Sequence, residues 1–249
     1  MRSPTSPWLI CLRKNPRASL RLFCIPYAGG NVAVFRAWPD GLPTSIEVWA
    51  VQPPGRGTRM WETPYTRVGP FIQDLSEAIS PFLEIPYAIF GHSFGAMVSF
   101  ELSRSLRKRC EPSPIHLFVS ACAAPHLLGY ELPASKLSDQ DFLERLRSLN
   151  GTPREVLKNT ELLQVLLPTI RADFSVLESY VFSEEPALES KITIFGGMQD
   201  QGVDIEKLGA WRIHTTAPSR LQMFPGDHFF LQSSLALLLR AIAQDLLSQ

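Results

Sequence analysis

Cysteine is scarce in this chain, and net charge, signal sequences and long apolar runs are missing from it. The four cysteines among 249 residues show neither metal-ligand spacing nor the density of a disulfide framework. The 24 basic and 24 acidic side chains balance, which gives no reason to expect nucleic acid or an anionic membrane as a partner. No apolar run approaches the ~20 residues that span a bilayer, and the run at 8–12 is too short for a signal-peptide core. We therefore expect a cytoplasmic protein in a reducing compartment.

Short apolar runs of strand type alternate with helical stretches along the chain. The strand-like runs cover 20–25, 46–51, 87–90, 115–120, 192–195 and 221–224. Helices are predicted over 71–83, 94–108 and 232–247. Continuous apolar strands that alternate with helices indicate a parallel sheet covered on both faces. The pattern therefore predicts an α/β fold with a mostly parallel central sheet flanked by helices.

The alternation stops between about residues 125 and 189, where helical signals occur without a convincing strand. Ser138 is placed to cap a helix whose first turn carries Asp139 and Asp141, because acidic side chains complement the helix dipole there. A longer apolar stretch runs from 161 to 181 and is interrupted by Pro168. We predict one domain over 1–249, with a helical lid inserted at about 125–189 in preference to a second domain.

The segment Gly91-His92-Ser93-Phe94-Gly95 lies between a strand-like run and a predicted helix. A serine between two glycines at such a turn is typical of a nucleophile elbow, in which the serine backbone is strained. The glycines lack a Cβ, which lets the strand and the helix approach closely. An ordinary turn is the alternative for so short a motif, and the strand and helix on either side favour the catalytic interpretation.

A serine hydroxyl needs a base and an orienting acid before it becomes a good nucleophile. His228 is the candidate base, because it follows the last strand and precedes the final helix, at the sheet edge that it shares with Ser93. A structural role for His228 is the alternative. The other four histidines are assigned structural or loop positions: His92, His116, His126 and His214.

Asp200 is the candidate acid, because it ends a glycine-containing loop after a predicted strand. Asp204 is the second choice. Asp227 adjoins His228 in sequence and is poorly placed to bond its imidazole. The chain order Ser93, Asp200, His228 is that of the α/β-hydrolases.

Acyl transfer also needs two N–H donors for the developing negative oxygen. One is expected from the backbone of Phe94, immediately after the nucleophile. The other is expected from the glycine-containing turn at 26–30, where Ala28 is the first choice and Tyr27 or Gly29 are alternatives. A tight turn with a purely structural role is the competing interpretation.

Five motifs follow one another in order. They are FCIPYAGG at 23–30, PGR at 54–56 with Arg59, GHSFGA at 91–96, LPTIRAD at 167–173 and GDHFFL at 226–231. This series resembles the type II thioesterases, the free-standing editing enzymes of polyketide and nonribosomal peptide assembly lines. The match runs from about Leu20 to the C-terminus. In the family form an acidic residue follows the first arginine of this motif. The sequence PGRGTR at 54–59 departs from that form, because Gly57 follows Arg56.

The resemblance implies an α/β-hydrolase fold and hydrolysis of acyl thioesters held on the phosphopantetheine arm of carrier domains. It assigns the nucleophile to Ser93, the base to His228 and the acid to Asp200, with no metal or cofactor. The implied partners are acyl or peptidyl carrier domains, and we expect a monomer that binds neither nucleic acid nor membranes. The alternatives are a general esterase or acyltransferase on the same triad, and a catalytically silent module that binds carrier proteins.

Two charged segments have both a structural and a functional interpretation. Arg171-Ala172-Asp173 could serve the site or pair within the lid, and we favour pairing. The basic run of Arg104, Arg107, Lys108 and Arg109 could meet an acidic carrier protein. We favour a helix C-terminus whose cations complement the dipole.

Overall fold

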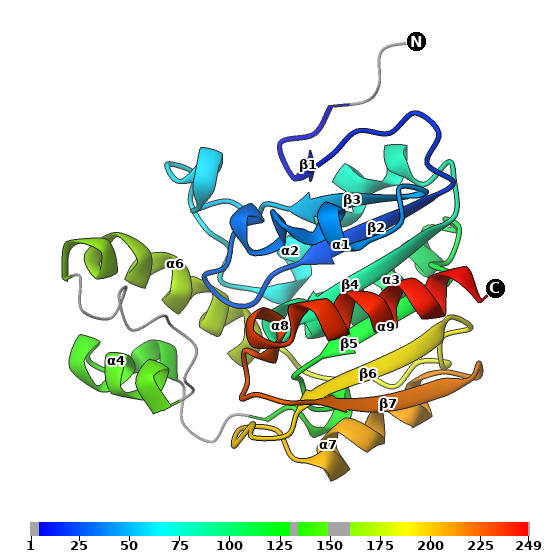
Figure 1. The fold of residues 1–249 in the computed structure, drawn as a ribbon. Coiled ribbons are helices and arrows are strands. Elements are labelled where there is room, and N and C mark those ends of the chain that lie inside the picture. The colour runs from blue at the N-terminus through cyan, green and yellow to red at the C-terminus, as the bar shows by residue number, and fades with distance from the viewer. Residues whose placement is uncertain (1–4, 130–133, 149–159, 249) are drawn as a thin grey trace.

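A seven-stranded sheet forms the centre of the computed structural model, which describes residues 5–129, 134–148 and 160–248 (Figure 1). The strands lie in the order β1-β3-β2-β4-β5-β6-β7. Their bounds are β1 Leu9–Cys11, β2 Leu20–Ile25, β3 Ile46–Val51, β4 Tyr87–His92, β5 His116–Ser120, β6 Lys191–Gly197 and β7 Ser219–Phe224. All neighbours pair in parallel except β1, which runs antiparallel to β3. The predicted mostly parallel α/β fold is confirmed.

Helices cover both faces of the sheet, because successive side chains of a strand point to opposite faces. In β2, Leu22 and Cys24 pack on one face, and Phe23 and Ile25 pack on the other. The first face is covered by α1 (Trp38–Gly41), α8 (Phe230–Ser233) and α9 (Leu235–Leu247). The second is covered by α2 (Val68–Ile79), α3 (Phe94–Lys108) and α7 (Ile205–Gly209). Five of the predicted strands are almost wholly buried and form continuous apolar runs. The edge strand β7 is only half-buried, and it was recognisable from Leu221, Met223 and Phe224 at its end.

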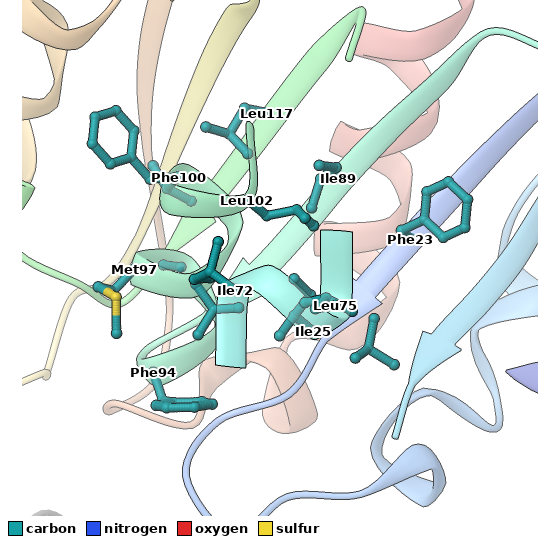
Figure 2. Close-up of a cluster of buried hydrophobic side chains, with 14 of the residues drawn as sticks. Phe23, Ile25, Ile72, Leu75, Ile89, Phe94, Met97, Phe100, Leu102 and Leu117 are labelled. Atoms are coloured by element: carbon teal, nitrogen blue, oxygen red, sulfur yellow. The ribbon is translucent and has the colours of Figure 1, made fainter. Parts of the chain in front are cut away.

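The larger core lies between the sheet and helices α2 and α3 (Figure 2). Phe23, Ile89 and Leu117 project from three neighbouring strands toward Leu75 of α2 and Leu102 of α3, and all five are buried. Burying each such side chain contributes about 1.5–3 kcal/mol relative to leaving it exposed. This packing holds the N-terminus of α3 against the end of β4, where Ser93 lies.

An insertion between β5 and β6 contains α4 (Asp139–Ser148) and α6 (Thr160–Glu178), and it lies beyond the carboxyl ends of the strands (Figure 1). Its own small core includes Phe142 of α4 and Phe174 of α6. The predicted cap is present, because the Asp141 N–H donates to Ser138 Oγ at 3.2 Å. The parts of the predicted insertion at 130–133 and 149–159 lie outside the described residues.

Three local expectations need correction, and one strand was not expected. The α6 helix continues through Pro168 despite the lost hydrogen bond and the crowding of the proline ring, because Thr169, Ile170 and Asp173 hold the following turns against the loops after β3 and β2. The last helix is divided at Ser234, whose hydroxyl donates to Pro225 O at 2.7 Å. The first large helix, α2, begins three residues earlier than predicted and ends at Ile79, four residues before the predicted end, where a 3-10 turn follows at Ser80–Phe82. The three-residue strand β1 was not predicted at all.

Within the described ranges, no helix combines the length and apolarity needed to cross a bilayer.

Candidate active site

Ser93 occupies the turn between β4 and α3 with a φ of 54° and a ψ of −113°. A non-glycine residue in this region is strained, and it persists only where the surroundings hold it. Its N–H donates to Ser120 O at the end of β5, at 2.7 Å. A Cβ on Gly91 would lie 2.0 Å from Gly95 O, and one on Gly95 would lie 2.2 Å from Ile25 O. The strand, the strained serine and the close-packed helix of a nucleophile elbow are therefore all present.

His228 and Asp200 meet at the same edge of the sheet, in the loops that follow β7 and β6. His228 Nδ1 lies 2.8 Å from Asp200 Oδ2, and the two side chains are 12% and 3% exposed. The ring of His228 also lies 5.4 Å from the ring of His92, the residue before Ser93. An ionised carboxylate only accepts hydrogen bonds, so Nδ1 carries a proton, and in the neutral imidazole Nε2 is then the acceptor.

The surroundings of Asp200 favour its ionised form. Burial alone would raise the pKa of Asp200, but the hydrogen bond and charge of His228 and the amides of Gly202 and Val203 hold that pKa below its ordinary value. The Gly202 N–H donates to Asp200 Oδ1 at 2.8 Å. Asp204, the second choice for the acid, instead caps α7 by accepting the Lys207 N–H at 2.8 Å. Of the two candidates, the structure brings Asp200 to the imidazole.

The turn after β2 faces the elbow, since a Cβ on Gly95 would contact both Ile25 O and Pro26 O. Gly30 N–H donates to Tyr27 O at 2.8 Å, and Gly29 N–H donates to Asp173 Oδ2 at 2.7 Å. The Gly29 amide is thus already engaged by a carboxylate. The Tyr27 carbonyl and the Ala28 N–H belong to one planar trans peptide and point in opposite directions. Because that carbonyl points into the turn, the Ala28 N–H points out of it.

Comparison with known proteins decides the family. The sequence matches the thioesterase domain family over residues 20–246. The chain belongs to the thioesterase family. The gramicidin S biosynthesis protein GrsT of Aneurinibacillus migulanus is 44% identical over 232 residues, which cover 93% of this chain and 91% of GrsT. The medium-chain S-acyl fatty acid synthase thioesterase of Rattus norvegicus is 32% identical over 228 residues, which cover 90% of this chain and 86% of that enzyme.

A solved structure agrees over the whole length. The type II thioesterase BorB from the borrelidin biosynthetic cluster superimposes with a TM-score of 0.89 at 32% identity, and the match covers 98% of this chain and 99% of BorB. Fold, family and length therefore agree with the resemblance seen in the motifs. This protein is a serine thioesterase of the type II kind.

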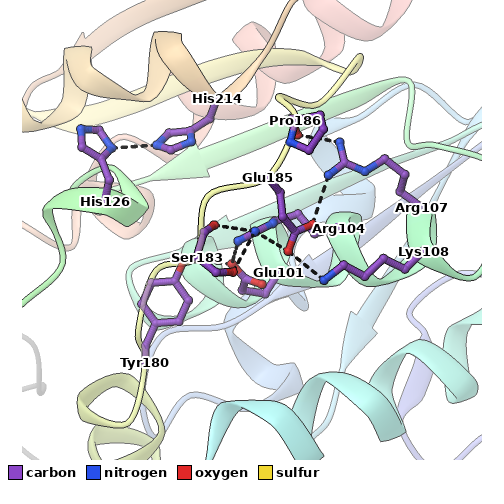
Figure 3. Close-up of polar contacts among 10 residues, drawn as sticks. All are labelled: Glu101, Arg104, Arg107, Lys108, His126, Tyr180, Ser183, Glu185, Pro186 and His214. Carbon is purple, nitrogen blue, oxygen red and sulfur yellow. Dashed lines mark hydrogen bonds and ion pairs between the residues drawn. The ribbon is translucent and has the colours of Figure 1, made fainter.

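The other four histidines of the thioesterase bond to partners other than Asp200. His92 is fully buried, with Nδ1 2.9 Å from Ser120 Oγ. His116 is buried on β5, with Nε2 2.9 Å from Thr193 Oγ1, and burial lowers its pKa to about 4. His126 Nδ1 lies 2.8 Å from His214 Nε2 (Figure 3). Sequence reasoning missed this last pair, because its members lie 88 residues apart and share no motif.

The basic run on α3 is paired within the chain (Figure 3). Arg104, Arg107 and Lys108 all contact Glu185, in the segment after α6. Arg104 also bonds Glu101 Oε1 at 2.7 Å and Ser183 O at 2.7 Å. The structure supports the structural interpretation of these side chains. They form ion pairs within the chain in addition to complementing the helix dipole.

The Arg171-Ala172-Asp173 segment divides into two roles. Arg171 pairs within the insertion, with Asp139 Oδ1 at 2.7 Å, as predicted. Asp173 instead binds Arg56 from the loop after β3 through two parallel bonds of 2.6 and 2.7 Å. This buried pair joins the insertion to the sheet edge. Among the described residues, no group of three or more His, Cys, Asp or Glu side chains is placed to hold a metal ion.

Proposed function

We propose that this thioesterase hydrolyses aberrant or stalled acyl groups from the phosphopantetheine arms of carrier domains. The observation that carries the proposal is the 2.8 Å bond between His228 and Asp200 at the same sheet edge as the strained Ser93. The names of the relatives support the choice of partner, since GrsT is a gramicidin S biosynthesis protein and BorB comes from a borrelidin biosynthetic cluster. The proposed partners are acyl and peptidyl carrier domains of a polyketide or nonribosomal peptide synthase.

In the proposed mechanism, His228 Nε2 takes the hydroxyl proton of Ser93, and the resulting alkoxide attacks the thioester carbonyl. Asp200 fixes the tautomer of His228 and stabilises the imidazolium that forms. The N–H groups of Phe94 and Ala28 bind the developing oxyanion. Phe94 is suited to this role because it is the first residue of α3, where backbone amides lack a partner within the helix.

The tetrahedral intermediate then collapses and breaks the carbon–sulfur bond. His228 returns its proton to the departing pantetheine thiol, so the carrier arm leaves as a free thiol. A water molecule, deprotonated by His228, attacks the acyl-Ser93 ester. The bond between the acyl carbon and Ser93 Oγ then breaks, and His228 returns the proton to Oγ, which releases the carboxylic acid and restores the free enzyme. The proposed cycle uses no metal or cofactor. We also propose that the helices of the insertion act as a lid that bounds the acyl chamber.

The test is hydrolysis of a short acyl group from a loaded carrier protein. Ser93→Ala should lower kcat by at least about 10⁴-fold, because the nucleophile is lost. Asp200→Asn should lower kcat by about 10³–10⁴-fold, because the amide favours the wrong tautomer of His228. Asp204→Asn is the matched control and should keep near-normal turnover, because asparagine caps a helix as well as aspartate does. Undiminished turnover by Ser93→Ala would refute the proposal.

Two further measurements separate the alternatives. A general esterase would turn over oxygen esters faster than carrier thioesters, and an acyltransferase would pass the acyl group to an alcohol in preference to water. A silent binding module would leave Ser93 unlabelled by an active-site fluorophosphonate. Sedimentation of the purified enzyme tests the proposed monomer, and cell fractionation tests the proposed cytoplasmic location.

A further inference from the structure

The carboxylate of Asp173 lies between two parts of the site that come from distant segments. It accepts the Gly29 N–H at 2.7 Å and both terminal nitrogens of Arg56 at 2.6 and 2.7 Å. Arg56 and Asp173 are both buried. A buried charge pair is stable only when its hydrogen bonds are well made, and here all three bonds to the Asp173 carboxylate are short and charge-assisted.

The bond to Gly29 fixes one of the two peptide planes that flank Ala28. Gly29 has a φ of +74°, and Gly30 N–H donates to Tyr27 O, which together describe a type II turn. In a type II turn, the peptide between the second and third residues, here Ala28 and Gly29, places the N–H of the third residue on one side of the turn. Flipping that peptide gives a type I turn. Asp173 Oδ2 accepts this N–H and so favours the observed orientation.

The other plane that flanks Ala28 is fixed by the bond from Gly30 N–H to Tyr27 O. With both planes held, the φ and ψ of Ala28 are determined, and so is the direction of its N–H. Ile170 of α6 packs closely against Gly29, since an added Cβ there would lie 2.5 Å from Ile170 Cγ1. Two residues of α6 thus press on the turn that presents the Ala28 amide.

Arg56 offsets the electrostatic cost of a carboxylate next to the proposed oxyanion site. A negative charge one residue from an oxyanion donor would oppose the negative oxygen that forms in the transition state. The two-pronged contact with Arg56 neutralises Asp173 while leaving Oδ2 bonded to Gly29. Arg56 also donates to Gly30 O at 3.2 Å, so it holds the far end of the same turn.

We propose that Asp173, neutralised by Arg56, is a positioning residue that orients the Ala28 N–H for the oxyanion. This inference rests on the proposed function, because it takes Ala28 as an oxyanion donor and Ser93 as the nucleophile. It gives the Asp173 segment of α6 a part in the chemical step in addition to any part in covering the substrate.

The test compares two double variants that carry the same charge. Arg56→Gln with Asp173→Asn removes both charges and keeps an oxygen that can accept the Gly29 N–H. Arg56→Gln with Asp173→Ala removes the same charges and that acceptor. The substrate is a soluble p-nitrophenyl ester, so the result does not depend on the identity of the natural acyl carrier. Thermal unfolding by circular dichroism selects a temperature at which both variants are folded.

We expect the alanine pair to have a kcat about 10–100-fold below that of the asparagine pair, at an unchanged KM, because a misoriented donor weakens only the transition state. The inhibition constant of a boronic acid, which forms a tetrahedral adduct on serine, should rise in parallel. A purely structural role would lower the unfolding temperature of the alanine pair and leave these two constants equal in both variants.

If the alanine pair does not fold, Asp173→Glu replaces it. Glutamate keeps the charge pair with Arg56 and displaces the acceptor from Gly29, so kcat should again fall at constant KM. Equal kcat values for the folded variants would overturn the inference. Ser93→Ala, assayed on the same ester, separates the two proposals: activity in that variant refutes the proposed function, whereas an inactive Ser93→Ala with no effect at Asp173 refutes the positioning role alone.

Discussion

Substituting alanine for Gly29 is expected to destabilise the fold by about 2–5 kcal/mol, because two separate penalties meet at this residue. At the φ of +74° an alanine would have to adopt the left-handed backbone conformation, which costs about 1–2 kcal/mol. The same Cβ would lie 2.5 Å from Ile170 Cγ1 and 3.3 Å from Ile170 Cδ1. Overpacking of this kind costs about 1–3 kcal/mol.

A double-mutant cycle separates the two penalties. Ile170→Ala removes both offending atoms and leaves only Cβ, at an ordinary contact distance of 3.6 Å. That variant alone should cost about 2–5 kcal/mol. Combined with Gly29→Ala, it should cost about 1–3 kcal/mol less than the sum of the two single variants, because the steric part is relieved and the backbone strain remains.

Ile170→Val is the matched control, because valine keeps a Cγ at the position of the nearest clashing atom. Its combination with Gly29→Ala should be additive within about 0.5 kcal/mol. Urea unfolding followed by circular dichroism gives the free energy of unfolding of each variant. Additivity in the Ile170→Ala cycle would refute the contact between α6 and the turn, and so would an equal relief by valine and alanine.

Two other predictions concern residues outside the active site. Burial, followed by the neighbouring His126 and Arg104, lowers the pKa of His214 to about 4, so as the pH falls below about 6.5 the unfolded chain binds a proton before the folded one does. The stability that neutral His214 contributes is complete above pH 6.5 and lost by pH 4. Over this interval the free energy of unfolding of the wild type should therefore fall by up to about 3 kcal/mol more than that of His214→Gln. Urea unfolding at several pH values measures the difference. Glu185→Gln should cost about 1–3 kcal/mol, because it weakens the contact with buried Arg104, whereas Lys108→Ala at the exposed end of the same cluster should change the free energy of unfolding by less than about 0.5 kcal/mol. Equal losses for these two variants in thermal unfolding would contradict that assignment.

Local sequence patterns were enough to predict much of the fold. Five strands were predictable because parallel strands buried on both faces form continuous apolar runs, and the half-buried edge strand β7 was predictable from the apolar residues at its end. The strand β1 was missed because it has only three residues and packs at the edge of the sheet. The elbow was visible because its strand, glycines and helix are contiguous in the sequence.

The site was predictable where chain order and strand ends define it. Asp200 and His228 each follow a strand of one parallel sheet, so the topology itself brings them to one edge. The sequence ranked Asp200 before Asp204 in the same loop, and the structure adds that Asp200 contacts His228 whereas Asp204 caps α7. The pairing of Arg56 with Asp173 spans 117 residues and depends on how the insertion folds back, which no local pattern reports.

The anchoring of α6 also sets a boundary for engineering. Thr169, Ile170 and Asp173 contact the loops after β3 and β2, and all three follow Pro168. The last three turns of α6 are therefore fastened to the catalytic framework, although the chain order assigns them to the insertion. In a chimera that borrows the proposed lid from a relative, the junction belongs just before Thr169, so that the lid can be exchanged without moving the turn at 26–30.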